Sequence, residues 1–332
     1  MADVAARAGV SHQTVSRVLN DSTFVRPETK ERVLEAIVEL GYRRNPAARA
    51  LVTRRSAVVG VVVADLSYFG PSSTVVGIEA AARGARFSTV LASLPDVTAD
   101  AVGAALERVM AAGAEAVVVI GHHGTGLDLG PGSGYRVPIV VLDGGADGSV
   151  LSVGVDQRAG AVLATQHLID LGHRRIAHLS GPRSWYQARQ RRQGWRQTLA
   201  RAGLSAPVPL IGDWSASSGY RLGRQLAADD EVTAVFAAND QMAIGLIRAL
   251  VEAGRRIPED VSVVGYDDIP EAGFLSPPLT TVRQDFRALG QEAMRMVLSS
   301  LTGDDVGSRL VAPQIVVRDS TSSPDRSGSG SG

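Results

Sequence analysis

Apolar residues in the first forty positions recur at helical spacing in three short segments. The segments cover residues 3–8, 12–20 and 27–40, and each places its apolar side chains on one face of a helix. Ser11 is a suitable N-cap for the second helix, and Pro27 suits the first position of the third. A helix, a short turn containing glycine and a second helix form the helix-turn-helix pattern. We therefore expect a small all-α head at the N-terminus.

From residue 57 the pattern changes to short β-branched runs that alternate with stretches of helical period. The expected strands cover residues 58–64, 88–94, 116–120, 139–142, 176–179, 234–237 and 262–265. The expected helices cover residues 74–84, 99–113, 157–172, 188–203, 218–228, 240–254 and 285–302. This alternation predicts an α/β body with parallel sheets and helices on both faces. More than six strands favour two doubly wound lobes, with a ligand cleft between them.

These patterns divide the chain into four parts. The expected parts are a head at 1–44, a connector at 45–55, a two-lobed body at 56–319 and a flexible tail at 320–332. The tail ends in alternating serine and glycine, which is typical of a flexible linker.

Composition excludes several classes of protein. Hydrophobic residues make up 45% and charged residues 20% of the 332 positions, as in ordinary globular domains. The chain has no cysteine, which excludes disulfides, thiolate zinc sites and a cysteine nucleophile. No apolar run approaches the roughly 18 residues that a membrane span requires, and the N-terminal segment is too polar for a secretory leader. We therefore expect a soluble, cytoplasmic protein.

The formal net charge of zero hides a polarity along the chain. Residues 1–60 contain ten lysines and arginines against six acidic residues, so this segment carries +4 and the remainder −4. A basic end on an acidic body favours a polyanion partner at that end. A merely solvated basic face would have the same composition.

Several segments carry a resemblance to one family. Residues 10–20 (VSHQTVSRVLN) resemble the recognition segment of the LacI/GalR-type family of transcriptional regulators, and residues 45–51 (NPAARAL) resemble its hinge helix. Segments similar to the same family follow in the family's order at 171–176 (LGHRRI), 238–243 (ANDQMA), 263–268 (VVGYDD) and 278–282 (PLTTV). Residues 212–216 (GDWSA) and 284–287 (QDFR) are more similar to the member after which the family is named than to the family at large.

The resemblance implies a function for each part of the chain. It implies a helix-turn-helix DNA-binding domain at 1–44, a hinge helix and linker at 45–55, and a periplasmic-binding-protein-like body at 56–319. The body would bind a small effector and form a homodimer, and the DNA partner would be a double-stranded, pseudo-palindromic operator. The resemblance implies no enzyme activity, cofactor, metal or membrane partner.

The two ends depart from the family's pattern. Family members usually have a few residues, including a Ser or Thr cap, before the first helix, whereas only Met1 and Ala2 precede Asp3 here. Either the true start lies upstream or the first helix frays. The segment after Arg318 lacks the leucine heptads with which some dimers join into tetramers, so we expect no tetramer of that kind.

The resemblance places helix 12–20 in the major groove. Glutamine pairs with adenine and arginine with guanine at base edges, while shorter polar side chains suit phosphate contacts. The expected base-reading residues are His12, Gln13, Ser16 and Arg17, and the expected phosphate contacts are Ser11, Thr14 and Asn20. The alternative is that these residues form only a solvated helix face.

Residues 45–53 are predicted to become helical only on DNA. Asn45 is a good N-cap, but nine residues are fewer than the roughly 12–15 that make an isolated helix even marginal. The resemblance assigns DNA contacts to Asn45, Ala48 and Leu51, with Leu51 as a wedge pushed into a base step. Amide exchange across 45–53 should therefore be fast in the free protein and slow on operator. Equal protection in both states would mean that the segment is a plain linker.

The effector implied by the resemblance is a sugar, namely a galactoside or a similar glycoside. A sugar site needs an aromatic face for the C–H side of the ring and charged planar groups for paired hydroxyls. The expected effector-binding residues are Phe69, Asp143, Arg191, Trp214, Asn239, Asp267 and Phe286. Trp214 could alternatively be ordinary core. Residues 68–69 and 185–187 are bulkier or more polar than their family counterparts, so that end of the site should differ.

Other motifs are weaker. The glycine-rich residues 121–134 lack the Lys-Ser/Thr of a phosphate loop, and His122 and His123 lack partners at metal-ligand spacing. Asp240, Asp267 and Asp268 could form an acid–base set, but they equally suit binding of hydroxyls without turnover.

Three function classes remain: a ligand-gated regulator, either induced or of corepressor type; a sugar-binding protein without a transcriptional role; and a sugar-modifying enzyme. The head favours the regulator.

Overall fold

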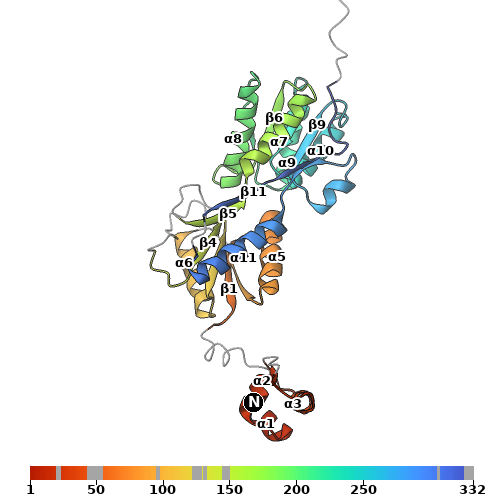
Figure 1. Cartoon of the computed structure of the whole chain (residues 1–332). Coiled ribbons are helices and arrows are strands. Elements are labelled where there is room, and N and C mark those ends of the chain that lie inside the picture. Colours follow the sequence, from red (N-terminus) through yellow and green to blue (C-terminus); the bar gives the residue numbers. More distant parts are fainter. Residues whose placement is uncertain are drawn as a thin grey trace, which may run out of the picture. The chain divides into compact units, whose positions relative to one another are not determined.

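The computed structural model describes residues 1–19, 24–42, 55–94, 98–121, 129, 133–143, 150–304 and 307–324. The chain divides into two compact units, Met1–Ser56 and Ala57–Gly332 (Figure 1). None of the described helices is long and apolar enough to cross a membrane.

The described residues of the N-terminal unit form three helices. They are α1 (Ala2–Ala8), α2 (His12–Leu19) and α3 (Pro27–Glu39). Gly9 ends α1 in the left-handed region at φ 61°, and Pro27 begins α3 as expected. The three helices share one apolar core of Val4, Ala5, Ala8, Val15, Val18, Val33 and Ala36. Helix α1 has no side-chain cap, and an ion pair of 2.7 Å between Arg7 and Glu39 links it to α3.

The first lobe of the second unit is a parallel sheet in the order β11-β5-β4-β3-β1-β2. Its strands are β1 (Val58–Ala64), β2 (Ser88–Leu94), β3 (Ala116–Ile120), β4 (Ile139–Leu142), β5 (Leu151–Val155) and β11 (Arg309–Val311). Helices α5 (Phe69–Gly84) and α11 (Phe286–Thr302) cover one face, and α6 (Ala99–Ala111) covers the other. Alternate strand residues face the two layers: Val61 packs with α5 and α11, and Val62 packs with α6.

The second lobe has the sheet order β12-β10-β9-β8-β6-β7. Its strands are β6 (Ile176–Ser180), β7 (Leu210–Ile211), β8 (Ala234–Ala237), β9 (Ser262–Asp267), β10 (Thr280–Arg283) and β12 (Gln314–Val316), and only β12 is antiparallel to its neighbour. Helices α7 (Gln157–Asp170) and α8 (Tyr186–Arg201) cover one face. Helices α9 (Ala216–Ala227) and α10 (Asp240–Glu252) cover the other, and a short 3₁₀ helix, η1 (Pro270–Phe274), follows β9. The expected helix-turn-helix head and two-lobed α/β body are both present.

The chain crosses between the lobes three times. The crossings follow β5, β10 and β11, so the first lobe contains α11 and β11 from the C-terminal part of the chain. Figure 1 shows α11 lying beside α5 in the first lobe. Gln157 and Gln284, at the first two crossings, are buried and joined by a hydrogen bond of 2.9 Å.

The prediction that a flexible tail begins at residue 320 is wrong for 320–324. Ser320 is fully buried, where its hydroxyl donates to the Val263 carbonyl at 2.6 Å and accepts from the Thr280 amide at 2.8 Å. His173 Nε2 contacts the Ser322 carbonyl at 2.9 Å. The segment is held by hydrogen bonds from small polar residues, so its hydrophobic pattern gave no signal. Residues 325–332 lie outside the described residues.

The crossing of α5 and α11 leaves no space for a side chain at Gly77. A Cβ there would lie 2.3 Å from the Phe286 carbonyl oxygen, whereas a Cβ at Gly84, in the same helix, would meet nothing within 4 Å. We expect Gly77→Ala to lower the free energy of unfolding by about 1–3 kcal/mol, as overpacking does, and to weaken ligand binding by shifting Phe286. Gly84→Ala should be neutral or stabilising by up to about 1 kcal/mol. Urea unfolding of both variants checks this, and equal effects would contradict the proposed close packing.

Candidate functional site

A cavity of about 310 Å³ lies between the two lobes, and residues at the carboxyl ends of several strands line it. This is the place where doubly wound sheets generally bind ligands. All seven residues expected to bind an effector line this one cavity: Phe69, Asp143, Arg191, Trp214, Asn239, Asp267 and Phe286.

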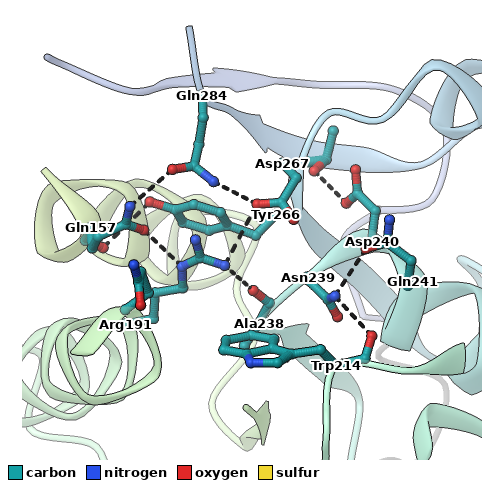
Figure 2. A network of polar contacts seen from close by, with 12 residues as sticks. Gln157, Arg191, Trp214, Ala238, Asn239, Asp240, Gln241, Tyr266, Asp267 and Gln284 are labelled. Atoms are coloured by element: carbon teal, nitrogen blue, oxygen red, sulfur yellow. Dashed lines mark hydrogen bonds and ion pairs between the residues drawn. The ribbon is translucent and has the colours of Figure 1, made fainter. Parts of the chain in front are cut away.

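The second lobe supplies a polar wall centred on Arg191 (Figure 2). Arg191 Nε donates to Gln157 Oε1 at 2.9 Å, and Nη1 donates to the Ala238 carbonyl and lies 3.6 Å from Asp267 Oδ1. The guanidinium also lies against the Tyr266 ring, 3.7 Å from its centroid, a favourable cation–π contact. Arg191 is 4% exposed, so its orientation is fixed before any ligand arrives.

Asp267 faces Arg191 from the end of β9. Gln284 Nε2 donates to Asp267 Oδ1 at 2.6 Å, and the ion pair with Arg191 uses the same oxygen. Among the described residues no contact engages Oδ2, which leaves this oxygen for a ligand hydroxyl. Burial raises the pKa of Asp267 to about 6, and Arg191 and Gln284 oppose that shift. The backbone of Asp267 lies at φ 114°, an unfavourable conformation that fixes the direction of the side chain.

Asn239 holds the aromatic part of the wall in place. Its Oδ1 accepts the Met242 amide at 3.0 Å and so caps α10, while Nδ2 donates to the Trp214 carbonyl at 3.0 Å and to Gln241 Oε1 at 2.9 Å. Trp214 has φ 75° and packs on Gly181, where a Cβ would lie 2.2 Å from the indole ring. Both amide hydrogens of Asn239 are thus engaged, and its clearest role in this structure is to position Trp214.

The first lobe supplies a mainly apolar wall. Phe69 and Phe286 meet edge to face with centroids 5.7 Å apart, and Ile120 and Leu142 lie beside them in the cavity lining. Asp143 is the charged exception. Its Oδ1 accepts the Val155 amide at 3.2 Å and its Oδ2 accepts Gln187 Nε2 at 2.8 Å, while burial raises its pKa.

Four glutamines among the described residues line the cavity, and none was predicted as a site residue: Gln157, Gln187, Gln241 and Gln284. Gln157 and Gln284 lie at the lobe crossings, and Gln187 lies in the first turn of α8. Gln284 belongs to the QDFR segment that carries part of the family resemblance, which was a usable signal. Gln241 belongs to the ANDQMA segment of the same resemblance, and Gln187 lies in residues 185–187, which were expected to differ at one end of the site. Gln157 had no signal.

Asp240 is a structural residue beneath the cavity rather than part of it. Its oxygens accept from the Thr281 hydroxyl at 2.6 Å and the Ile269 amide at 2.9 Å, and it does not line the cavity. An acid–base set of Asp240, Asp267 and Asp268 is therefore not assembled around one ligand position. Among the described residues no cluster could hold a metal ion, and His122 and His123 lie outside them.

The buried Asp240 predicts a pH dependence of stability. Burial, with a contribution from Asp267, raises its pKa to about 8 from the usual 3.8. Between these values the folded chain holds a proton that the unfolded chain has lost, so stability falls as pH rises through this window. Asp240→Asn can keep both contacts and should flatten the slope between pH 5 and 8 by up to about 1.4 kcal/mol per pH unit.

Urea unfolding at several pH values measures this slope. Asp260→Asn is the control, since hydrogen bonds from Arg256 lower the pKa of that partly exposed carboxyl to about 2, outside the window. Parallel slopes for the wild type and Asp240→Asn would contradict the assignment.

Helix α2 presents its polar residues to solvent. Ser11, His12, Gln13 and Arg17 are exposed, Thr14 and Ser16 are half-buried, and Val15 and Val18 are buried. Ser11 Oγ accepts the Thr14 amide at 3.2 Å, which begins the helix as expected. The remaining predicted DNA contacts, Asn20, Asn45, Ala48 and Leu51, lie outside the described residues.

A helix-turn-helix unit joined to a two-lobed body with a ligand cavity is the organisation of a ligand-responsive transcriptional regulator. Comparison with known families agrees: residues 1–45 match the lacI family of bacterial regulatory proteins, and residues 165–321 match a periplasmic binding protein-like domain. The chain belongs to the lacI family, and it is a transcriptional repressor that binds operator DNA rather than an enzyme.

The relatives span nearly the whole chain. The lactose operon repressor of Escherichia coli K12 is 36% identical over 97% of this chain and 91% of its own length. The regulator CelR of Thermobifida fusca is 37% identical over 91% of each, and the repressor PurR of Haemophilus influenzae PittEE is 33% identical over 97% of this chain and 98% of its own.

Solved structures extend the similarity to three dimensions. A Lac repressor dimer bound to operator and the anti-inducer ONPF matches with a TM-score of 0.86 and 35% identity, over 96% of this chain and 98% of that one. A complex of CelR with cellobiose matches with a TM-score of 0.69 and 36% identity, over 96% of this chain and 98% of that one.

Proposed function

We propose that a small sugar, a galactoside or a similar glycoside, binds in the cavity and releases this repressor from its operator. The observation that carries the proposal is the buried pair of Arg191 and Asp267, with Trp214 close to the guanidinium at 5.7 Å. Neighbouring hydroxyls of a sugar ring require donors and acceptors side by side, and charge-assisted hydrogen bonds to them are strong. The apolar face of the same ring requires an aromatic surface, which Trp214 supplies.

The other lining residues take supporting roles in this proposal. Phe69 and Phe286 cover the apolar side of the ligand, and Asn239 keeps Trp214 in position. Asp143, which belongs to the first lobe, accepts a hydrogen bond from a hydroxyl of the ligand. The relatives solved with ligands include one with the sugar cellobiose, which supports the same class of effector.

The expected direction is induction. A ligand that contacts both lobes favours the lobe arrangement in which those contacts are complete. It shifts the equilibrium between lobe arrangements only through its difference in affinity for them.

We propose that residues 56–319 bind the effector and form a homodimer, and that residues 1–44 bind DNA, coupled to the body through 45–55. One head presents a single recognition helix, which is too few contacts for specific binding at cellular salt, so a dimer on a pseudo-palindromic operator is required.

Calorimetry and operator-binding anisotropy together test the proposal. The full-length protein is titrated with galactosides, glucosides and cellobiose, and with purine bases and amino acids as the competing class. We expect a sugar to bind and to weaken operator binding, and sedimentation to show a dimer. Tighter operator binding with ligand would make the protein a corepressor type, and binding of only a purine or an amino acid would reject the sugar effector.

A further inference from the structure

Two residues near the start of α8 reach across the cavity to the first lobe. The Trp185 ring meets the Tyr68 ring edge to face, with centroids 5.2 Å apart and planes at 81°. Gln187 Nε2 donates to Asp143 Oδ2 at 2.8 Å. All four residues line the cavity, so each contact joins the two lobes at the ligand site itself.

Trp185 also contacts a second aromatic ring, which belongs to the second lobe. It meets Trp214 edge to face at a centroid distance of 5.7 Å. Tyr68, Trp185 and Trp214 therefore form a continuous aromatic row from one lobe to the other along one side of the cavity. Trp214 cannot retreat, because its ring already fills the space above Gly181. The row is thus supported at its second-lobe end.

The polar wall lies elsewhere in the cavity. The contacts of Arg191 and Asp267 run to Gln157, Ala238, Tyr266 and Gln284, and none of them runs to Tyr68 or Trp185. A sugar bound to Arg191 and Asp267 with its apolar face on Trp214 would have Trp185 and then Tyr68 as the next rings of the row, so a substituent on that side of the sugar would meet them. The cavity volume of about 310 Å³ is at the lower end of the usual range for small-molecule sites, roughly 300–1,000 Å³.

We propose that Trp185 and Tyr68 limit the effector to an unsubstituted sugar or one with a small alkyl group, and exclude aryl glycosides. This inference rests on the sugar effector proposed above. The benzo ring of Trp185 occupies a volume similar to that of a phenyl substituent, so both cannot fill the same space. The hydrogen bond between Gln187 and Asp143 holds the first turn of α8, and with it Trp185, in this position.

Matched pairs of methyl and phenyl glycosides test the proposal by calorimetry on the full-length protein. Methyl and phenyl β-galactopyranoside form one pair, and methyl and phenyl β-glucopyranoside form the other. We expect the wild type to prefer the methyl member at least 10-fold. Trp185→Ala leaves a cavity lined by Tyr68 and Trp214, and apolar cavities of this kind bind benzene-sized groups. In this variant the preference for methyl should fall at least 10-fold.

Two further variants make the result decisive. Tyr68→Ala opens the same row from the first lobe and should change the methyl-to-phenyl ratio in the same direction, even if Trp185→Ala does not fold. Tyr186→Ala removes an adjacent aromatic residue that does not line the cavity, and it should leave the ratio unchanged. Equal binding of both members by the wild type, or unchanged ratios in both row variants, would overturn the size limit. Absence of binding by any sugar to any variant would instead reject the sugar effector.

Discussion

Replacing Asp267 with asparagine is expected to lower effector affinity about 10- to 100-fold while leaving operator affinity unchanged. Hydrogen bonds that involve a charged group contribute about 1.5–3 kcal/mol, and the variant loses the charge that faces Arg191 and the ligand. The fold should survive, because an amide oxygen can still accept from Gln284. Burial already raises the pKa of Asp267 to about 6, so its ionised form is disfavoured and a neutral amide removes that cost. Calorimetry with the effector and anisotropy with the operator give the two readouts.

Substitutions at two neighbouring arginines distinguish an effect on the ligand site from a general effect of lost charge on α8. Arg191→Ala removes the partner of Asp267 and should abolish effector binding. Arg192→Ala, one position along α8, removes the same charge from a residue that does not line the cavity and should leave effector affinity within about twofold. If Asp267→Asn and Arg191→Ala both bound the effector as the wild type does, the ligand would lie elsewhere.

Hydrophobic periodicity predicted most of the fold because the core strands are β-branched and bounded by helices. Strand β1 matches its predicted bounds, and α10 ends two residues before its predicted end. Helix α5 begins at Phe69, five residues before the expected start. The start was predicted too late because Pro71, which suggested a loop, lies in the first turn of the helix. Backbone N–H groups there have no intrahelical partner, so proline is tolerated where its sequence suggested a loop. The pattern did not identify strands β5, β10, β11 and β12, of which β11 and β12, at three residues each, are too short to show alternation.

The candidate site was predictable where its residues follow core strands. Asp143, Asn239 and Asp267 each lie one or two residues beyond a strand that the pattern predicted, at 139–142, 234–237 and 262–265. Gln157 and Gln284 are separated by 127 positions, and only the double crossing of the chain between the lobes brings them together. Periodicity within one segment carries no information about such pairs. The resemblance placed residues 68–69 and 185–187 at the same end of the site, but the contact between the rings of Tyr68 and Trp185 could not be read from periodicity for the same reason.

Simultaneous replacement of Gln13 and Arg17 by alanine should reduce operator binding to its non-specific level. The two residues lie four positions apart on the exposed face of α2, so both point away from the core residues Val15 and Val18. Each such base contact contributes about 1–3 kcal/mol of discrimination, and a dimer loses each one twice. The expected loss is about 10³-fold or more, which is the usual gap between specific and non-specific binding. Anisotropy on an operator selected from random sequences by the wild type measures it.

Arg7→Ala is the control for lost charge in the same unit. Arg7 pairs with Glu39 across α1 and α3, and both side chains are more than half exposed, so this variant should change stability by less than about 1 kcal/mol. It should keep specific binding, because Arg7 is not on α2.

Arg17→Ala alone should relax the preference at one base pair per half-site and leave the salt dependence nearly unchanged. If it instead weakened binding to all sequences equally and lowered the salt slope by about 1, Arg17 would be a phosphate contact and its base-reading role would be wrong.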